Sequence, residues 1–270
     1  MVNAQNRGEI VELLARYGLT PNKRLGQHFL ADANIVRKVV RTAGLEPGEK
    51  VLEIGAGTGT LTRLLVATGA QVVSYEIDAR LRPVLDEVLA GLSVDVRFED
   101  AMEADLARLT RTGDWVMVAN LPYNVGTTLV IDALQQAPNL KRLVVMMQTE
   151  VAARLVARPG SRAYGLSTVA AGLYADVSVA FSVPPQVFIP PPQVGSSVVV
   201  LKTRPAPRLA KEAVALAATA FRQRRKMLRG SLAGVVDAGQ LATAGLGPTK
   251  RAEELTPSDY LRLAEVTHGR

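Results

Sequence analysis

The sequence predicts an α/β fold, in which a doubly wound, mostly parallel sheet is followed by a small all-helical C-terminal domain. Short apolar runs of strand length alternate with segments of helical periodicity through the middle of the chain. A glycine-rich turn joins the first of these runs to a helix, and Arg204-Pro-Ala-Pro207 forms a stiff linker to a region without strands. We therefore expect two domains, at residues 1–203 and 204–270.

The expected elements begin with a helical arm. Its helices span 9–17 and 34–43, and an irregular segment at 23–32 lies between them. Strands are predicted at 51–54, 71–75, 94–98, 115–119, 143–147, 177–181 and 197–201. Helices are predicted at 60–68, 79–90, 127–136 and 150–157. The C-terminal domain is expected to contain helices at 209–221 and 224–235, short pieces around Leu241 and Glu253, and a last helix capped by Thr256.

The composition is typical of a folded protein: 48% of the residues are hydrophobic and 21% are charged. The absence of cysteine excludes disulfides, thiolate catalysis and cysteine-ligated zinc, and it suits a reducing cytoplasm. The first residues have no apolar core of a signal peptide, and no later run is long enough to cross a bilayer. We expect a cytoplasmic monomer that uses neither a membrane nor a metal ion.

The formal charge of +7 is concentrated near the C-terminal end. Residues 204–270 contain 12 Lys and Arg against 6 Asp and Glu, whereas residues 1–203 contain 20 against 19. This asymmetry indicates a nucleic-acid-binding module attached to a nearly neutral domain. At helical spacing Arg222, Arg225, Lys226 and Arg229 share one face, which we expect to contact RNA phosphates. A merely solvated basic helix surface is the alternative.

The segment Glu53-Ile-Gly-Ala-Gly-Thr-Gly59 follows a predicted strand and opens a helix. Gly55 and Gly57 allow the backbone to approach a nucleotide-like ligand closely in such a turn. A dinucleotide fingerprint needs glycine at the position of Thr60, so the spacing favours a ligand without a pyrophosphate, such as a sulfonium nucleoside. Alone, the loop is also compatible with a structural turn.

Two acidic residues follow the next two predicted strands. Glu76 lies 21 residues after Gly55, where a carboxylate can accept both ribose hydroxyls of an adenosine. Asp100 can accept a hydrogen bond from the adenine amine of the same ligand. Taken singly, either acid could be a solvated loop charge, but three such elements in this order favour a nucleoside site.

The segment Asn120-Leu121-Pro122-Tyr123 directly follows the predicted strand 115–119. The Asn120 side-chain carbonyl and the Leu121 backbone carbonyl can accept hydrogen bonds from the two N–H groups of a planar amine. Tyr123 offers a stacking face, worth roughly 1–3 kcal/mol per base. The only histidines, His28 and His268, are far apart in sequence, so methyl transfer would depend on placement rather than on a general base.

Phe188 lies in a proline-rich loop, Pro184 to Pro192. Consecutive prolines stiffen the loop, which could hold the Phe188 ring against the other face of an extruded base. The alternative is an ordinary inter-strand loop with Phe188 anchored in the core.

These motifs, in this order, resemble those of the ribosomal RNA adenine N6,N6-dimethyltransferases, and the resemblance covers nearly the whole chain. The matching segments are Lys23–Leu30, Glu53–Gly59, Glu76, Asp100–Met102, Asn120–Tyr123 and Phe188–Val194. The resemblance implies a Rossmann-like methyltransferase domain and S-adenosylmethionine as cofactor, contacted by His28, Leu30, Gly55, Glu76, Asp100 and Asn120. It also implies that Tyr123 and Phe188 sandwich the target adenine.

Within this family, Gln27–Asp32 and Tyr164–Ser167 are more similar to the small-subunit branch than to the large-subunit branch that confers macrolide resistance. The small-subunit branch converts two adjacent adenines near the 3′ end of small-subunit rRNA to dimethyladenine during ribosome maturation. Gln193 and Gly195 depart from the common lysine and aspartate, which weakens the case for RNA contacts at that loop. Three alternatives are kept: a large-subunit rRNA adenine methyltransferase of the macrolide-resistance type, a non-catalytic RNA-binding assembly or transcription factor, and a nicotinamide-dependent oxidoreductase.

Overall fold

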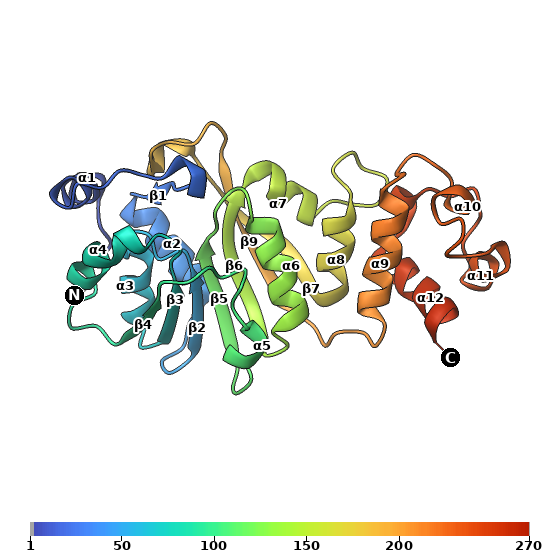
Figure 1. Cartoon of the computed structure of the whole chain (residues 1–270), viewed down its shortest axis with the longest axis horizontal. Coiled ribbons are helices and arrows are strands. Elements are labelled where there is room, and N and C mark those ends of the chain that lie inside the picture. Colours follow the sequence, from blue (N-terminus) through green and yellow to red (C-terminus); the bar gives the residue numbers. More distant parts are fainter. Residues whose placement is uncertain (1–2, 270) are drawn as a thin grey trace. The chain divides into compact units, whose positions relative to one another are not determined.

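The computed structural model describes residues 3–269, and the chain forms two compact units (Figure 1). The first unit runs to residue 152 and includes 178–202, and the second comprises 153–177 and the chain from 203 onward. The second break falls after residue 202, and residues 153–177 group with the C-terminal region. They do so because α8 (Leu166–Tyr174) packs against α9 (Ala210–Phe221) and α12 (Pro257–His268).

A seven-stranded sheet organises the first unit, with the strand order β4-β3-β2-β5-β6-β9-β7. The strands are β2 (Lys50–Ile54), β3 (Gln71–Tyr75), β4 (Val94–Arg97), β5 (Trp115–Asn120), β6 (Leu140–Gln148), β7 (Ala175–Val183) and β9 (Ser196–Thr203). The five strands from β4 to β6 are parallel, and β9 runs antiparallel to β6. All seven predicted strands are present, and the prediction of a mostly parallel α/β sheet is confirmed.

The strand order places the crevice of the sheet at β2. From β2 the chain adds β3 and then β4 on one side of the sheet. It then crosses back and adds β5 and β6 on the other side of β2. In open parallel sheets, ligands bind outside the carboxyl ends of the strands at such a reversal. The loops after Ile54, Tyr75 and Asn120 meet there.

The central strands of the sheet are buried on both faces. On one face, α2 (Ala33–Ala43) and α3 (Thr60–Val66) pack with Val51 and Val116 in one apolar cluster. Leu52 and Met117 point to the opposite face because side chains alternate along a strand, and both are fully buried. The helix α6 (Gly126–Gln136) lies against β6.

The N-terminal arm adds a second apolar cluster and a small sheet. Ile10, on α1 (Arg7–Arg16), packs in one cluster with Leu85, on α4 (Arg82–Val88). The segment expected to be irregular contains β1 (Phe29–Leu30), which pairs antiparallel with β8 (Phe188–Ile189). Remaining short elements of this part of the chain are η1 (Lys23–Leu25), η2 (Ala79–Leu81), α5 (Leu106–Leu109), α7 (Thr149–Leu155) and η3 (Pro185–Val187).

The second unit is helical, but the predicted helix at 224–235 is wrong. The helix α9 ends at Phe221, residues 222–226 form a turn, and α10 spans only Leu228–Ser231. The turn is held by contacts that a continuous helix could not make. Met227 pairs with Arg251 as an isolated bridge, and the N–H of Leu228 donates to the Lys250 carbonyl at 2.7 Å.

The rest of the second unit agrees with the predicted short pieces and last helix. It contains α11 (Ala238–Thr243), η4 (Ala252–Glu254) and α12. Thr256 caps α12 as predicted: its hydroxyl accepts the N–H of Asp259, whose carboxylate accepts the N–H of Thr256. This reciprocal capping box satisfies backbone donors at the start of the helix.

Candidate active site

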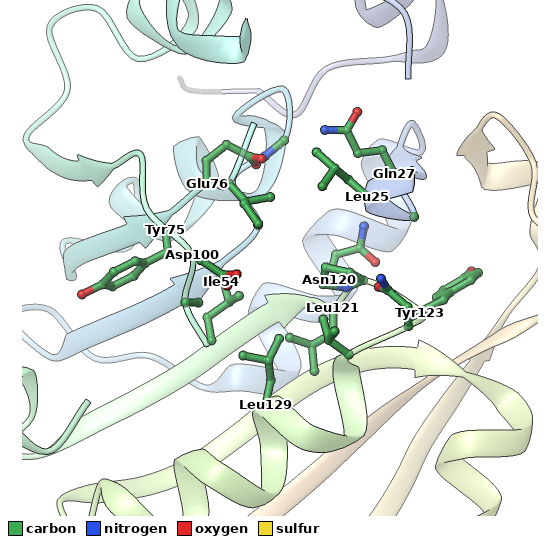
Figure 2. A pocket seen from close by; sticks show the side chains of 18 of the residues that line it. Leu25, Gln27, Ile54, Tyr75, Glu76, Asp100, Asn120, Leu121, Tyr123 and Leu129 are labelled. Atoms are coloured by element: carbon green, nitrogen blue, oxygen red, sulfur yellow. The ribbon is translucent and has the colours of Figure 1, made fainter. Parts of the chain in front are cut away.

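A cavity lies at the carboxyl edge of the sheet, where the ends of β2, β3 and β5 meet the N-terminal arm (Figure 2). Figure 2 shows Glu76 and Asp100 on one side, Asn120 and Tyr123 on the other, and Gln27 from the arm. The predicted site residues that line the cavity are His28, Gly55, Gly57, Glu76, Asp100, Asn120, Leu121, Pro122 and Tyr123. The structure therefore brings together residues that lie in five separate parts of the sequence.

The glycine loop lines the cavity with Gly55 and Gly57. Gly55 has φ of +84°, and its N–H donates to the Tyr75 carbonyl at 2.8 Å, which ties the loop to β3. Gly57 has φ of +57°, and a Cβ there would lie 3.2 Å from the Phe29 ring. Both positions therefore need glycine for conformation, and Gly57 also needs it for space.

Glu76 is buried and held by two backbone donors. Its Oε2 accepts the N–H of Gly57 at 2.8 Å, and its Oε1 accepts the N–H of Asp78 at 2.9 Å. Burial raises the pKa of the Glu76 carboxyl, and these two hydrogen bonds oppose the rise. A carboxylate has about four acceptor positions, so each oxygen retains capacity for a ligand hydroxyl.

Asp100 and two apolar side chains complete this side of the cavity. The Asp100 Oδ1 accepts the N–H of Met102 at 2.9 Å, which fixes the turn after β4. Met102 and Ile77 remain 39% and 47% exposed although both are large and apolar. Neither residue was predicted from the sequence, although each is an apolar residue within two positions after an acid that follows a strand. They can cover the faces of a planar ring.

Asn120, the last residue of β5, is oriented by the arm. Its Nδ2 donates to the His28 carbonyl at 3.1 Å, which leaves the side-chain oxygen as the acceptor available to a substrate amine. The N–H of Leu121 donates to the Met146 carbonyl at 3.0 Å, and the Leu121 side chain is buried. These contacts fix the turn before any substrate binds.

Tyr123 is held on one face and at its hydroxyl. Its ring stacks on the His28 imidazole with centroids 5.0 Å apart and planes 26° apart. Its Oη lies 2.7 Å from the Oγ of Ser196. Burial raises the pKa of the Tyr123 phenol, so the hydroxyl stays protonated at neutral pH.

Phe188 does not line the cavity, and this departs from its predicted stacking role. Its side chain is fully buried in the cluster with Val36 and Val116. Two contacts keep it there: β8 pairs with β1, and the Arg7 guanidinium donates to the Phe188 carbonyl at 2.8 Å. In this conformation Phe188 is anchored in the core, which was the alternative expectation for it, because the pairing of β8 with β1 turns its ring inward.

Leu30 does not line the cavity either. Its side chain is 3% exposed and packs in the same cluster as Phe188. Gln27 does line the cavity although sequence reasoning did not select it. Its Nε2 donates to the Asp78 Oδ2 at 2.9 Å and so ties the arm to the loop after Glu76. Hydrogen bonds from the Arg80 side chain lower the pKa of the Asp78 carboxyl.

A second buried carboxyl lies beneath the glycine loop. Ser74 Oγ and Thr62 Oγ1 donate to the Glu53 Oε2 at 2.6 and 2.7 Å, whereas its Oε1 is buried without a hydrogen-bond partner. Burial raises the pKa of Glu53 to about 7. Glu53 does not line the cavity, so it supports the loop rather than the ligand.

The predicted basic residues Arg222, Arg225, Lys226 and Arg229 belong to the second unit. All four are exposed, on the turn after α9 and on α10. The expected single helical face is wrong because the helix ends at Phe221. Among residues 3–269, no acidic side chain pairs with any of the four, whereas Arg224 between them pairs with Glu253.

Neither a membrane span nor a metal cluster emerges from residues 3–269. No helix in that range is long and apolar enough to cross a membrane. Within the same range, no three His, Asp or Glu side chains are grouped as metal ligands.

The strand order, the glycine loop, the two strand-end acids and the Asn120–Tyr123 turn define the class of S-adenosylmethionine-dependent methyltransferases. Residues 18–268 match the family described as ribosomal RNA adenine dimethylase. The chain belongs to this family, as its sequence motifs predicted.

Relatives and solved structures agree with this assignment. The chain is 45% identical over 263 residues to the ribosomal RNA small subunit methyltransferase A of Chelativorans sp., covering 94% of this chain and 95% of that one. It is 46% identical over 265 residues to the protein of the same name from Deinococcus radiodurans, covering 95% and 89%. A dimethyladenosine transferase from Plasmodium falciparum has a TM-score of 0.75 at 26% identity, covering 87% and 96%. The 23S rRNA methyltransferase ErmE has a TM-score of 0.68 at 27% identity, covering 88% and 99%.

The family settles three predictions. The protein is an enzyme, it uses S-adenosylmethionine, and it dimethylates adenine in ribosomal RNA. The nicotinamide-dependent alternative is excluded. The cavity fits this cofactor, because the buried Glu76 carboxylate, with its remaining acceptor capacity, suits a ribose diol.

Proposed function

We propose that this enzyme dimethylates two adjacent adenosines near the 3′ end of small-subunit ribosomal RNA, within the subunit or its precursor, and acts as a cytoplasmic monomer. The observation that carries the proposal is the Asn120–Tyr123 turn, which shares one cavity with Glu76 and Asp100. The names of the relatives from Chelativorans sp. and Deinococcus radiodurans support the choice of the small subunit.

In this proposal the cofactor is held by the loops that follow β2, β3 and β4. Glu76 accepts the ribose hydroxyls, and Asp100 accepts the adenine amine. Gly55 and Gly57 leave room beside the loop backbone, and His28 contributes from the arm. S-adenosylmethionine supplies the methyl group that is transferred. The acidic lining also suits a ligand with a positive charge at its sulfonium centre.

Asn120 and Leu121 position the substrate amine. The Asn120 side-chain oxygen and the Leu121 carbonyl accept its two N–H groups, which localises on the nitrogen the lone pair otherwise delocalised into the ring and directs it toward the methyl group. Pro122 restricts the turn, and Tyr123 stacks on the base. Because the Asn120 amide already donates to the His28 carbonyl, its acceptor is preorganised and loses little freedom on binding.

The second unit grips RNA phosphate through Arg222, Arg225, Lys226 and Arg229. Four exposed cations on the turn after α9 and on α10 present a concentrated positive charge. Since no acidic side chain among residues 3–269 neutralises them, their charge is available to an anionic partner. A solvated basic surface is the alternative, and the salt dependence of RNA binding distinguishes the two.

The decisive experiment is transfer of radiolabelled methyl groups from S-adenosylmethionine to purified ribosomal subunits that lack these modifications. We expect label on the small subunit and, after digestion of its RNA, four methyl groups on two adjacent adenosines. Label on the large subunit alone would refute the small-subunit proposal and indicate a 23S rRNA methyltransferase activity like that of ErmE. No label on either subunit, with cofactor binding intact by calorimetry, would favour a non-catalytic RNA-binding role.

A further inference from the structure

The ring of Tyr123 is restrained at two points that belong to different parts of the chain. The imidazole of His28, from the arm, covers one face of the ring at 5.0 Å. The hydroxyl of Ser196, from the start of β9, lies 2.7 Å from the phenol oxygen. The stacking contact restricts tilting of the ring, and the hydrogen bond restricts its swing about the side-chain torsions.

Ser196 is a fixed anchor for this hydrogen bond. It is fully buried and pairs in register with Gln148 of β6. The preceding carbonyl, that of Gly195, accepts the N–H of Thr149 at 2.9 Å. The backbone that carries the Ser196 hydroxyl is thus held by the main sheet, so the position of the hydroxyl follows from the fold rather than from a mobile loop.

We propose that Ser196 is a positioning residue for methyl transfer, which acts by holding Tyr123 in the orientation that receives the target base. The inference rests on the proposed function, in which Tyr123 stacks on the adenine. With His28 on one face, only the other face of the ring is open for stacking. The Ser196 hydrogen bond sets the angle of that face relative to Asn120, whose amide is held by the carbonyl of the same His28.

A loose Tyr123 ring would still bind RNA but would present the amine poorly. Misplacement of reacting groups by about 1 Å can lower a rate on the order of 10²-fold. Loss of one of the two restraints on Tyr123 displaces the ring less than this, so we expect the single-turnover rate to decrease about 10-fold. Cofactor affinity depends on Glu76 and Asp100 at the other side of the cavity and is expected to remain unchanged.

The test compares Ser196→Ala, Tyr123→Phe and the double variant, with small ribosomal subunits and radiolabelled S-adenosylmethionine. Each single variant removes one partner of the same hydrogen bond, and Tyr123→Phe retains the stacking ring. We expect both single variants to slow transfer about 10-fold, and the double variant to be no slower than either single one. Filter-binding affinity for RNA and calorimetric affinity for the cofactor should match the unmodified protein.

Ser197→Ala is the matched control. Ser197 is the next residue of β9, is buried like Ser196, and places its Oγ 3.2 Å from Thr149 rather than near Tyr123. It should keep the single-turnover rate within twofold.

Three results would overturn the inference. One is an unchanged rate in Ser196→Ala. Another is an unchanged rate in Tyr123→Phe, which decides the question even if Ser196→Ala does not fold. The third is a further 10-fold loss when Ser196→Ala is added to Tyr123→Phe, because that loss would not act through the phenol. An unmodified protein that fails to label small subunits would refute the proposed function instead.

Discussion

Replacing the buried Glu53 by glutamine should remove a pH dependence from the stability of this protein. Burial raises the pKa of Glu53 from 4.5 to about 7. Below pH 4.5 the carboxyl is protonated in both the folded and unfolded states. Between pH 4.5 and 7 the unfolded chain releases the proton while the folded protein retains it, so stability falls as pH rises. Above pH 7 the full cost of a buried charge is present.

The size of this effect follows from the pKa shift. A difference of about 2.5 pKa units corresponds to about 3 kcal/mol at pH 8, and to about 1 kcal/mol at pH 5. In Glu53→Gln the amide oxygen can still accept from Ser74 and Thr62, and the amide nitrogen replaces the oxygen that lacks a partner. Any penalty for that nitrogen is independent of pH. The stability difference between variant and unmodified protein should therefore shift by about 2 kcal/mol in favour of the variant from pH 5 to pH 8.

Urea unfolding at pH 5, 6, 7 and 8 measures this shift, with Glu46→Gln as the control for an exposed carboxyl on the chain segment before β2. The control should keep a constant difference from the unmodified protein across the series. If the Glu53→Gln difference is also constant, Glu53 is ionised in the folded protein at pH 5, and the reasoning from burial fails.

Three further predictions concern the site and the basic surface. Glu76→Ala should weaken S-adenosylmethionine binding by about 1.5–3 kcal/mol, because a charged acceptor is lost, and calorimetry that shows unchanged affinity would refute the ribose assignment. Asn120→Ala should lower the single-turnover rate about 10²-fold with RNA binding retained, and a near-normal rate would mean that another group positions the amine. Replacing Arg222, Arg225 and Arg229 together by Gln should weaken RNA binding and reduce its salt slope by about 0.7–0.9 per lost phosphate contact. Filter binding across a salt series checks this, and an unchanged slope would show that the surface is merely solvated.

The sequence alone determined the sheet and most of the cavity. The central strands β2, β5 and β6 are apolar runs that bury side chains on both faces of the sheet, so the local pattern was sufficient there. Gly55, Glu76, Asp100 and Asn120 could be selected because each directly follows a strand or lies within three residues of its end. Parallel strands bring their carboxyl ends to one edge of the sheet, so residues that follow different strands in the sequence lie around one cavity.

Only the tertiary structure decided how the remaining residues are oriented. Phe188 turns into the core because β8 pairs with β1 from the N-terminal arm, and no local pattern around Phe188 specifies that partner. The helix expected at 224–235 is reduced to Leu228–Ser231, because Met227 bridges to Arg251 and the Leu228 N–H bonds to the Lys250 carbonyl instead of continuing a helical ladder from α9. The contacts of Tyr123 with His28 and with Ser196 likewise join segments that are far apart in the sequence. Helical and strand periodicity indicate which face of an element is buried. These contacts instead join residues far apart in the chain, so they stabilise the protein only after it has folded and no local pattern predicts them.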